Sequence, residues 1–160
     1  MKKAYLAHTF TLRQYVKDEV IPILKDIVDT VNPFYNKDGT TSREEVQIAD
    51  ELDKEGVNAR DTRKWVNMVR KKNKNIVEED LKLIDTCDIL IAFLTEWSGG
   101  TVMEIAYMGI FKQKPVYVVT QNQYIYDHPW CIYACKYGKI VKTLNELIKI
   151  LKEELLCGKI

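Results

Sequence analysis

The segment of the sequence best suited to chemistry is 97–104, which runs Trp-Ser-Gly-Gly-Thr-Val-Met-Glu. It follows the longest apolar run and is expected to open a helix, where free backbone N–H groups favour anions. Gly99 and Gly100 let the backbone approach a ligand closely. Glu104 lies one turn further along, where the helix N-terminus favours its ionised form. Such a carboxylate suits attack on a cationic sugar carbon, or its stabilisation.

Two structural alternatives stay open for this segment. Thr101 and Glu104 also match a capping box, in which the glutamate only bonds back to the backbone N–H of Thr101. Ser98 has a comparable alternative, in which its hydroxyl merely caps the loop.

A second carboxylate, Asp80, lies on the helix that leads into the apolar run, upstream of Glu104. Apolar residues within 76–84 predict the buried face of that helix, so we expect Asp80 near the rim of the core. Taken alone, Asp80 has the features of a solvated helix residue. Paired with Glu104, it becomes a candidate acid or substrate-positioning group, because glycosidic chemistry divides its work between two such groups.

The elements that must position these residues alternate between strands and helices. Apolar runs predict strands at 4–7, 32–35, 89–94, 116–119 and 139–141. Helical spacing predicts helices at 11–31, in interrupted form over 42–85, at 101–112 and at 144–155. This alternation predicts an α/β fold: a flavodoxin-like or Rossmann-like, doubly wound five-stranded parallel sheet in strand order 2-1-3-4-5. The loops after Leu6 and Leu94 then face the site, because ligands bind at the switch point of such sheets.

Local signals refine the helical boundaries. Pro22 predicts a kink or break near Val20–Ile21. Ser42 and Glu45 form a capping-box pattern that predicts a helix start, and Gly56 and Asn58 predict its end.

Composition limits the class of protein. The chain has 160 residues, 46% of them hydrophobic and 29% charged, with a net charge of +1. These values predict a single domain over residues 1–160 and no general attraction to nucleic acid or membranes. No secretory segment is recognised and no apolar run could cross a bilayer, so a cytoplasmic location is expected.

The cysteines and histidines do not form a metal-site pattern. Cys131 and Cys135 have three residues between them, not the two of a redox or zinc pair, and neither His8 nor His128 lies at a ligand spacing from a cysteine. We expect reduced thiols, no metal and no cofactor.

The ordered motifs resemble a known family. The run Ile76-Val77-x-x-Asp80-Leu81-x-x-Ile84-x-x-x-Asp88-Ile89-Leu90-Ile91-Ala92, followed by Ser98-Gly99-Gly100-Thr101-x-x-Glu104-Ile105-Ala106-Tyr107, is similar to the nucleoside 2-deoxyribosyltransferases and the related deoxynucleoside 5′-monophosphate N-hydrolases. Lys114-Pro115-Val116 and the strand 4–7 continue the resemblance, whereas the stretch between and the C-terminal quarter match poorly.

This resemblance implies roles for individual residues. It implies that Glu104 is the nucleophile, that Asp80 contacts the nucleoside and aids proton transfer, and that Tyr5 orients the glutamate. The transferases have an aspartate six residues before the glutamate, which holds the sugar 5′-hydroxyl; here Ser98 occupies that position, as in the monophosphate hydrolases. A hydroxyl beside helix N–H groups suits a phosphate dianion that an aspartate would repel. His8 departs from the small residue frequent in relatives and is expected to narrow the base pocket or contact the base.

Two further features stay ambiguous. Basic residues within 60–74 suit a phosphate or a polynucleotide, but a solvated helix face explains them better, so a nucleic-acid partner is not expected. The aromatic stretch 124–130 suits base stacking, core packing or a subunit interface equally. The resemblance implies a homodimer or higher homo-oligomer.

These features together predict a retaining N-glycosidase or deoxyribosyltransferase that acts on a small nucleoside or nucleotide. Its Glu104 would form a glycosyl ester that water or a second base then resolves. An NAD-type glycohydrolase and a non-enzymatic nucleotide-binding module are the alternatives.

Overall fold

The computed structural model describes all 160 residues of the chain. By internal contacts the chain divides into two compact units. Met1–Pro33 and Leu83–Ile160 form the first, here called the sheet unit, and Phe34–Lys82 form the second, the helical unit. No helix combines the length and apolar character that a membrane span requires.

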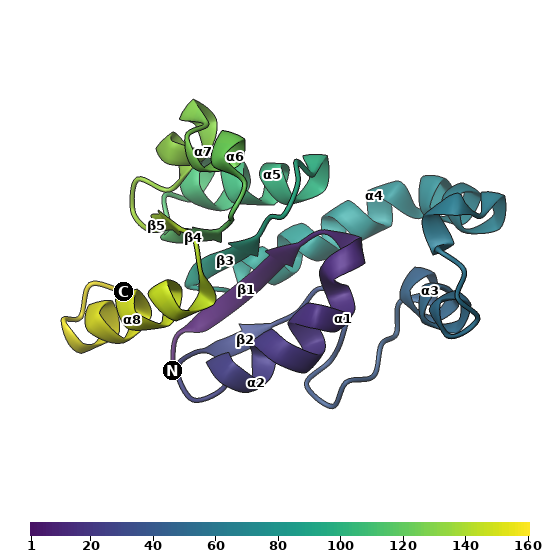
Figure 1. The fold of residues 1–160 in the computed structure, drawn as a ribbon, viewed down its shortest axis with the longest axis horizontal. Coiled ribbons are helices and arrows are strands. Elements are labelled where there is room, and N and C mark those ends of the chain that lie inside the picture. Colours follow the sequence, from purple (N-terminus) through teal and green to yellow (C-terminus); the bar gives the residue numbers. More distant parts are fainter. The chain divides into compact units, whose positions relative to one another are not determined.

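The sheet unit contains one five-stranded sheet in the order β2-β1-β3-β4-β5, and all its neighbouring strands are parallel. This arrangement confirms the predicted doubly wound α/β fold and its 2-1-3-4-5 order (Figure 1). The strands are β1 (Lys3–His8), β2 (Asp29–Val31), β3 (Ile89–Phe93), β4 (Val116–Val119) and β5 (Lys139–Val141).

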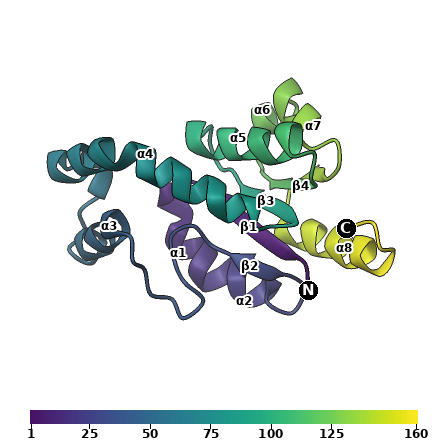
Figure 2. The same ribbon diagram turned by 180° about the vertical axis from the view of Figure 1, so that it is seen from behind.

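Helices cover both faces of this sheet, as Figures 1 and 2 show. One face packs against the helical stretch after β1 and the last helix, around a core that includes Leu6, Ile91 and Tyr117. The elements on that side are η1 (Phe10–Leu12), α1 (Arg13–Tyr15), η2 (Val16–Val20), α2 (Ile21–Leu24) and α8 (Leu144–Leu156). The opposite side carries α5 (Gly99–Ala106), η4 (Tyr107–Phe111), α6 (Gln123–Tyr126) and α7 (Pro129–Ala134).

The helical unit is built from α3 (Glu44–Lys54), the 3₁₀ helix η3 (Ala59–Asp61) and most of α4 (Arg63–Asp85), whose last residues belong to the sheet unit. The buried indole of Trp65 donates to the Glu45 carbonyl across 2.8 Å and so ties α4 to α3. Gly56 follows α3 with a φ of 74°, a left-handed conformation that favours glycine, which confirms the predicted end of that helix.

Two boundaries predicted near the N-terminus are wrong. The helix expected over 11–31 ends at Leu24, and the second strand is Asp29–Val31 instead of 32–35. The ladder with β1 forms over Asp29–Val31, and Pro33 lacks the N–H that a longer ladder would need. The irregularity predicted by Pro22 is present as a π-helical turn, in which the Ile21 N–H donates to the Val16 carbonyl.

Two helix starts also differ from expectation. α3 begins at Glu44 after Arg43, with no side-chain cap, so the Ser42–Glu45 capping box is wrong. The Glu45 carboxylate is buried and instead lies 4.0 Å from the Arg43 guanidinium. α5 begins at Gly99 and not at Thr101.

Candidate functional site

The segment around Glu104 connects the most buried strand to a helix on one face of the sheet. β3 is buried along its whole length, and Ser98 precedes α5 with an extended backbone. Gly99 and Gly100 form the first turn of α5, and a Cβ added to either would meet no atom within 4 Å. The chain's own packing therefore does not require glycine at these two positions, and the open space beside them is accessible to a ligand.

Glu104 and Tyr5 form a direct hydrogen bond. The Tyr5 hydroxyl donates to Glu104 Oε1 across 2.7 Å. Tyr5 is fully buried in β1, between Val31 and Leu90 on the neighbouring strands, so its ring direction is fixed by the sheet. The Glu104 side chain is half-buried and is thereby directed toward β1.

This bond bears on the alternative role of Glu104 as a helix cap. Thr101 lies inside α5 and not at its N-cap, so the Thr101–Glu104 capping box is wrong. The Thr101 hydroxyl is buried and donates to Ser98 Oγ across 3.3 Å. Ser98 occupies the N-cap, but its side chain makes no capping hydrogen bond. The Ser98 hydroxyl therefore retains its own proton for donation to a ligand.

His8 ends β1 beside the switch point of the sheet. Its ring is 4% exposed, and Nδ1 lies 3.1 Å from the Thr9 carbonyl. Burial lowers the pKa of His8 to about 4, although hydrogen bonds with Thr9 and Asn32 oppose that shift. The imidazole is therefore neutral over the physiological pH range.

Asp80 lies in the helical unit, where its partner is Arg43. Arg43 Nη2 lies 2.6 Å from Asp80 Oδ1, and the side chains are 9% and 18% exposed. Burial raises the pKa of Asp80 above its ordinary value, while the charge and hydrogen bond of Arg43 oppose this rise. Arg43 could not be identified from the sequence, because a single arginine in a loop of mixed charge carries no recognisable pattern.

The aromatic stretch 124–130 lies in α6 and at the start of α7, two short helices that were not predicted from the sequence, and it contacts Trp97 in the loop before α5. Trp97, Tyr124 and His128 form an aromatic cluster with ring centroids 4.8 to 6.0 Å apart, in which Tyr124 meets the other two rings edge-to-face. Trp97 and Tyr124 are nevertheless exposed. This aromatic cluster therefore borders the Ser98 loop and offers ring surface to solvent.

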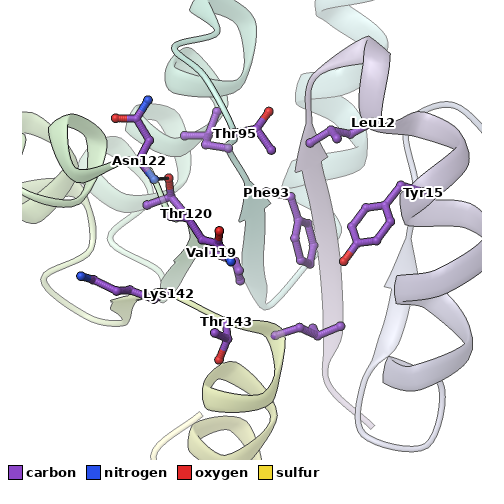
Figure 3. A pocket seen from close by; sticks show the side chains of 12 residues that line it. Leu12, Tyr15, Phe93, Thr95, Val119, Thr120, Asn122, Lys142 and Thr143 are labelled. Atoms are coloured by element: carbon purple, nitrogen blue, oxygen red, sulfur yellow. Dashed lines mark hydrogen bonds between the residues drawn. The ribbon is translucent and has the colours of Figure 1, made fainter.

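A cavity of about 690 Å³ lies beyond the carboxyl ends of β3, β4 and β5. Figure 3 shows Phe93 between Val119 and Tyr15, with Thr120, Asn122 and Lys142 along the polar side. Neither Tyr5 nor Glu104 lines it, since the cavity lies against α1 and the start of α8, whereas Glu104 projects from α5 on the opposite face. We place the candidate chemistry at Glu104 and not in this cavity, because the cavity contains no carboxylate.

The cysteines and the basic segment 60–74 form no further site. No group of histidine, cysteine, aspartate and glutamate side chains is arranged to hold a metal ion. All four cysteines are free thiols, and burial raises the pKa of Cys131 and, to about 12, that of Cys135. In the basic segment most side chains are exposed, and Lys72 and Lys74 pair with Glu44 and Glu78.

Comparison with known proteins identifies a family for this chain. No curated protein matches the chain. The sequence profile of the family described as nucleoside 2-deoxyribosyltransferase matches residues 11–146, which is most of the chain and runs through both units. The five-stranded parallel sheet and the hydrogen bond between Tyr5 and Glu104 agree with this match. We conclude that the chain belongs to the nucleoside 2-deoxyribosyltransferase family.

Proposed function

We propose that this protein cleaves the N-glycosidic bond of deoxynucleosides or their 5′-monophosphates, with Glu104 as the nucleophile. Family membership supports a glycosyl-transfer enzyme that acts on nucleosides. The Tyr5–Glu104 hydrogen bond carries the assignment of the nucleophile, because the buried tyrosine orients this carboxylate.

The proposed reaction proceeds in two balanced steps. A Glu104 carboxylate oxygen bonds to C1′ as the C1′–N bond breaks, and the base departs with the electrons of that bond and takes up a proton. Water, or the nitrogen of a second base, then attacks C1′ and releases Glu104 as a carboxylate. Two displacements at C1′ retain the configuration of the sugar. The reaction needs no metal or cofactor.

Ser98 supports a preference for 5′-monophosphates. Its side chain makes no helix-capping bond, and it stands beside the exposed first turn of α5. A neutral hydroxyl and backbone N–H groups suit a phosphate dianion. Gly99, Gly100 and Thr101 complete this proposed phosphate loop.

Asp80 and His8 have supporting roles in the proposal. We assign Asp80 to contact with the nucleoside on the basis of its position in the family motif. His8 is assigned to the shape of the base pocket, since burial keeps its ring neutral. We also treat residues 1–160 as one functional domain, because the family match spans both compact units.

We further propose that the protein is a homodimer or higher homo-oligomer. Large apolar side chains are exposed on α5, η4 and α7, which pack against one another. They are Met103, Phe111, Trp130, Ile132 and Tyr133. Light scattering coupled to size-exclusion chromatography tests this proposal, and a monomer at micromolar concentration would contradict it.

A substrate panel tests the proposed activity. The protein is incubated with deoxynucleosides, deoxynucleoside 5′-monophosphates, ribonucleotides and NAD, and free base is measured by chromatography. We expect base release from monophosphates in preference to nucleosides. Nicotinamide release would instead identify an NAD-type glycohydrolase, and tight binding without turnover would identify a nucleotide-binding module.

The same panel, repeated with an added acceptor base, separates hydrolysis from transfer. A hydrolase yields free deoxyribose 5-phosphate at an unchanged rate. A transferase yields a new nucleoside or nucleotide and little free sugar.

A further inference from the structure

Arg43 is the most deeply placed cation of the helical unit. It precedes α3, and its side chain is 9% exposed. Its guanidinium carbon lies 6.0 Å from the centroid of the Phe34 ring. An arginine held in this manner is already oriented, so it loses little side-chain freedom when it bonds a carboxylate.

Three carboxylates surround this guanidinium. Asp80 Oδ1 is in direct contact at 2.6 Å, whereas Glu79 Oε2 is 3.7 Å from the same nitrogen and Glu45 Oε1 is 4.0 Å from Nη1. Only Asp80 is within hydrogen-bond distance. Arg43 is thus primarily the partner of Asp80, with Glu45 from α3 and Glu79 from α4 as further charges nearby.

Asp80 would be poorly stabilised as an anion without Arg43. Burial raises the pKa of Asp80, and the charges of Glu79 and Glu45 add to that rise. The charge and hydrogen bond of Arg43 are the opposing influences. Arginine stays protonated at every pH at which a protein is folded, so this support is constant.

We propose that Arg43 is a positioning residue for Asp80, which it holds as an oriented carboxylate, so that Asp80 accepts a hydrogen bond from the substrate and does not donate a proton to it. The donor of this hydrogen bond would be a sugar hydroxyl or an N–H of the base. The proton taken up by the departing base then comes from water. This inference rests on the proposed function, because that function assigns Asp80 to the substrate.

The two possible roles of Asp80 predict opposite changes with pH. A carboxylate that must be ionised fails when it is protonated, so activity is lost on the acid side of the profile. A carboxylic acid that must donate a proton fails when it is ionised, so activity is lost on the basic side. A substitution that raises the pKa of Asp80 therefore narrows the pH range of activity from the acid side in the first case. In the second case it extends that pH range to higher pH.

The test compares wild type with Arg43→Met and Arg43→Lys. Arg43→Met removes the charge and keeps apolar bulk, and Arg43→Lys keeps the charge but not the planar fork. Glu79→Gln is the matched control, because it removes the charge of a mostly exposed carboxylate that lies near the same guanidinium. Circular dichroism and thermal unfolding verify folding. If Arg43→Met does not fold, Arg43→Lys supplies the comparison, with a smaller shift in the Asp80 midpoint.

Two readouts are measured on each variant. Carboxyl NMR of Asp80 gives its titration midpoint without substrate, and base release gives kcat/KM against pH. We expect Arg43→Met to raise the titration midpoint of Asp80. The acid limb of the kcat/KM profile should move to higher pH by the same number of pH units. Activity then falls about tenfold for each pH unit below the new midpoint. Glu79→Gln should move both slightly in the opposite direction.

Distinct results overturn the inference and the proposed function. An unchanged Asp80 midpoint in Arg43→Met, or activity that extends to higher pH, would refute the role given to Arg43. A wild-type protein that releases no base from any member of the panel would refute the proposed function, and the NMR titration would still decide whether Arg43 keeps Asp80 ionised.

Discussion

Tyr5 and Glu104 are 99 positions apart in the sequence, yet the hydroxyl of one lies 2.7 Å from the carboxylate of the other. The sheet brings them together, because β1 and β3 are parallel neighbours and α5 follows β3 on the face toward which Tyr5 points. A helix residue is thereby oriented by a strand residue. The first and third strands together set the direction of the proposed nucleophile.

Tyr5→Phe is expected to lower kcat more than it raises KM. The phenyl ring fills the same buried volume but no longer orients Glu104, and misplacement of a reacting group is costly. We expect kcat to fall about tenfold to a hundredfold. The loss of one hydrogen bond should lower the free energy of unfolding by about 1 kcal/mol. Steady-state kinetics and denaturant unfolding measure the two effects.

Tyr117→Phe is the matched control for this prediction. Tyr117 is also a fully buried tyrosine in the sheet, and its hydroxyl donates to Glu154 on α8. Its ring packs in the core on the opposite face from α5. The variant should lose comparable stability and keep its kcat. Equal losses of kcat in both variants would show that the Tyr5 effect is only a loss of stability.

Glu104→Gln is expected to remove turnover and leave the fold intact. The amide keeps a group that can accept from Tyr5 but is not a nucleophile toward C1′, so kcat should fall by about a thousandfold or more. Glu96→Gln is the control, because Glu96 is an exposed carboxylate in the loop before α5. Near-normal activity in Glu104→Gln would exclude Glu104 as the nucleophile.

The sequence predicted the layers of the fold better than the ends of its elements. Unbroken apolar runs marked the buried strands, and their alternation with helices predicted a doubly wound parallel sheet. The end of the first helix was misplaced, because Val31 of β2 continues the apolar spacing of Ile27 and Val28, and only the pairing of β2 with β1 marks it as a strand residue. α6 and α7 were missed because each is too short for a helical period to be visible.

The candidate site was predictable where a motif carried it. The Ser-Gly-Gly-Thr segment and Glu104 could be identified, since their types and spacing imply a phosphate loop and a carboxylate. Arg43 could not be identified, because its importance comes from contact with Asp80 across 37 positions. The aromatic cluster around Trp97 could not be identified either, because its partners Tyr124 and His128 come from α6 and from the residue before α7.

Ser98→Asp is expected to reverse the preference between nucleosides and monophosphates. The new carboxylate repels a phosphate dianion and can accept from a 5′-hydroxyl. The ratio of kcat/KM for a monophosphate to that for the nucleoside should fall about tenfold or more. Ser98→Asn has nearly the same size without the charge and should change the ratio much less. A ratio unchanged by Ser98→Asp would mean that Ser98 does not approach the 5′-position.

Gly100→Ala tests whether a ligand approaches the first turn of α5. The added methyl would meet no atom of the chain within 4 Å, and alanine favours the helix by about 0.5–1 kcal/mol over glycine. Thermal stability should therefore be unchanged or higher, while KM for the monophosphate rises. Gly109→Ala provides the contrast, because its methyl would meet the Ala134 carbonyl oxygen at 2.0 Å and should cost about 1–3 kcal/mol.

His8 should make the stability of the protein depend on pH below neutrality. Burial lowers its pKa from 6.5 in the unfolded chain to about 4 in the folded protein, so between these values the unfolded state binds more protons. The contribution of His8 is complete above pH 6.5 and is lost as the pH falls toward 4, by about 3 kcal/mol in total. His8→Gln removes the titrating group, so the difference between the unfolding free energies of wild type and variant should decrease over this window. A difference that stays constant from pH 7 to pH 4 would show that His8 is not held neutral by the fold.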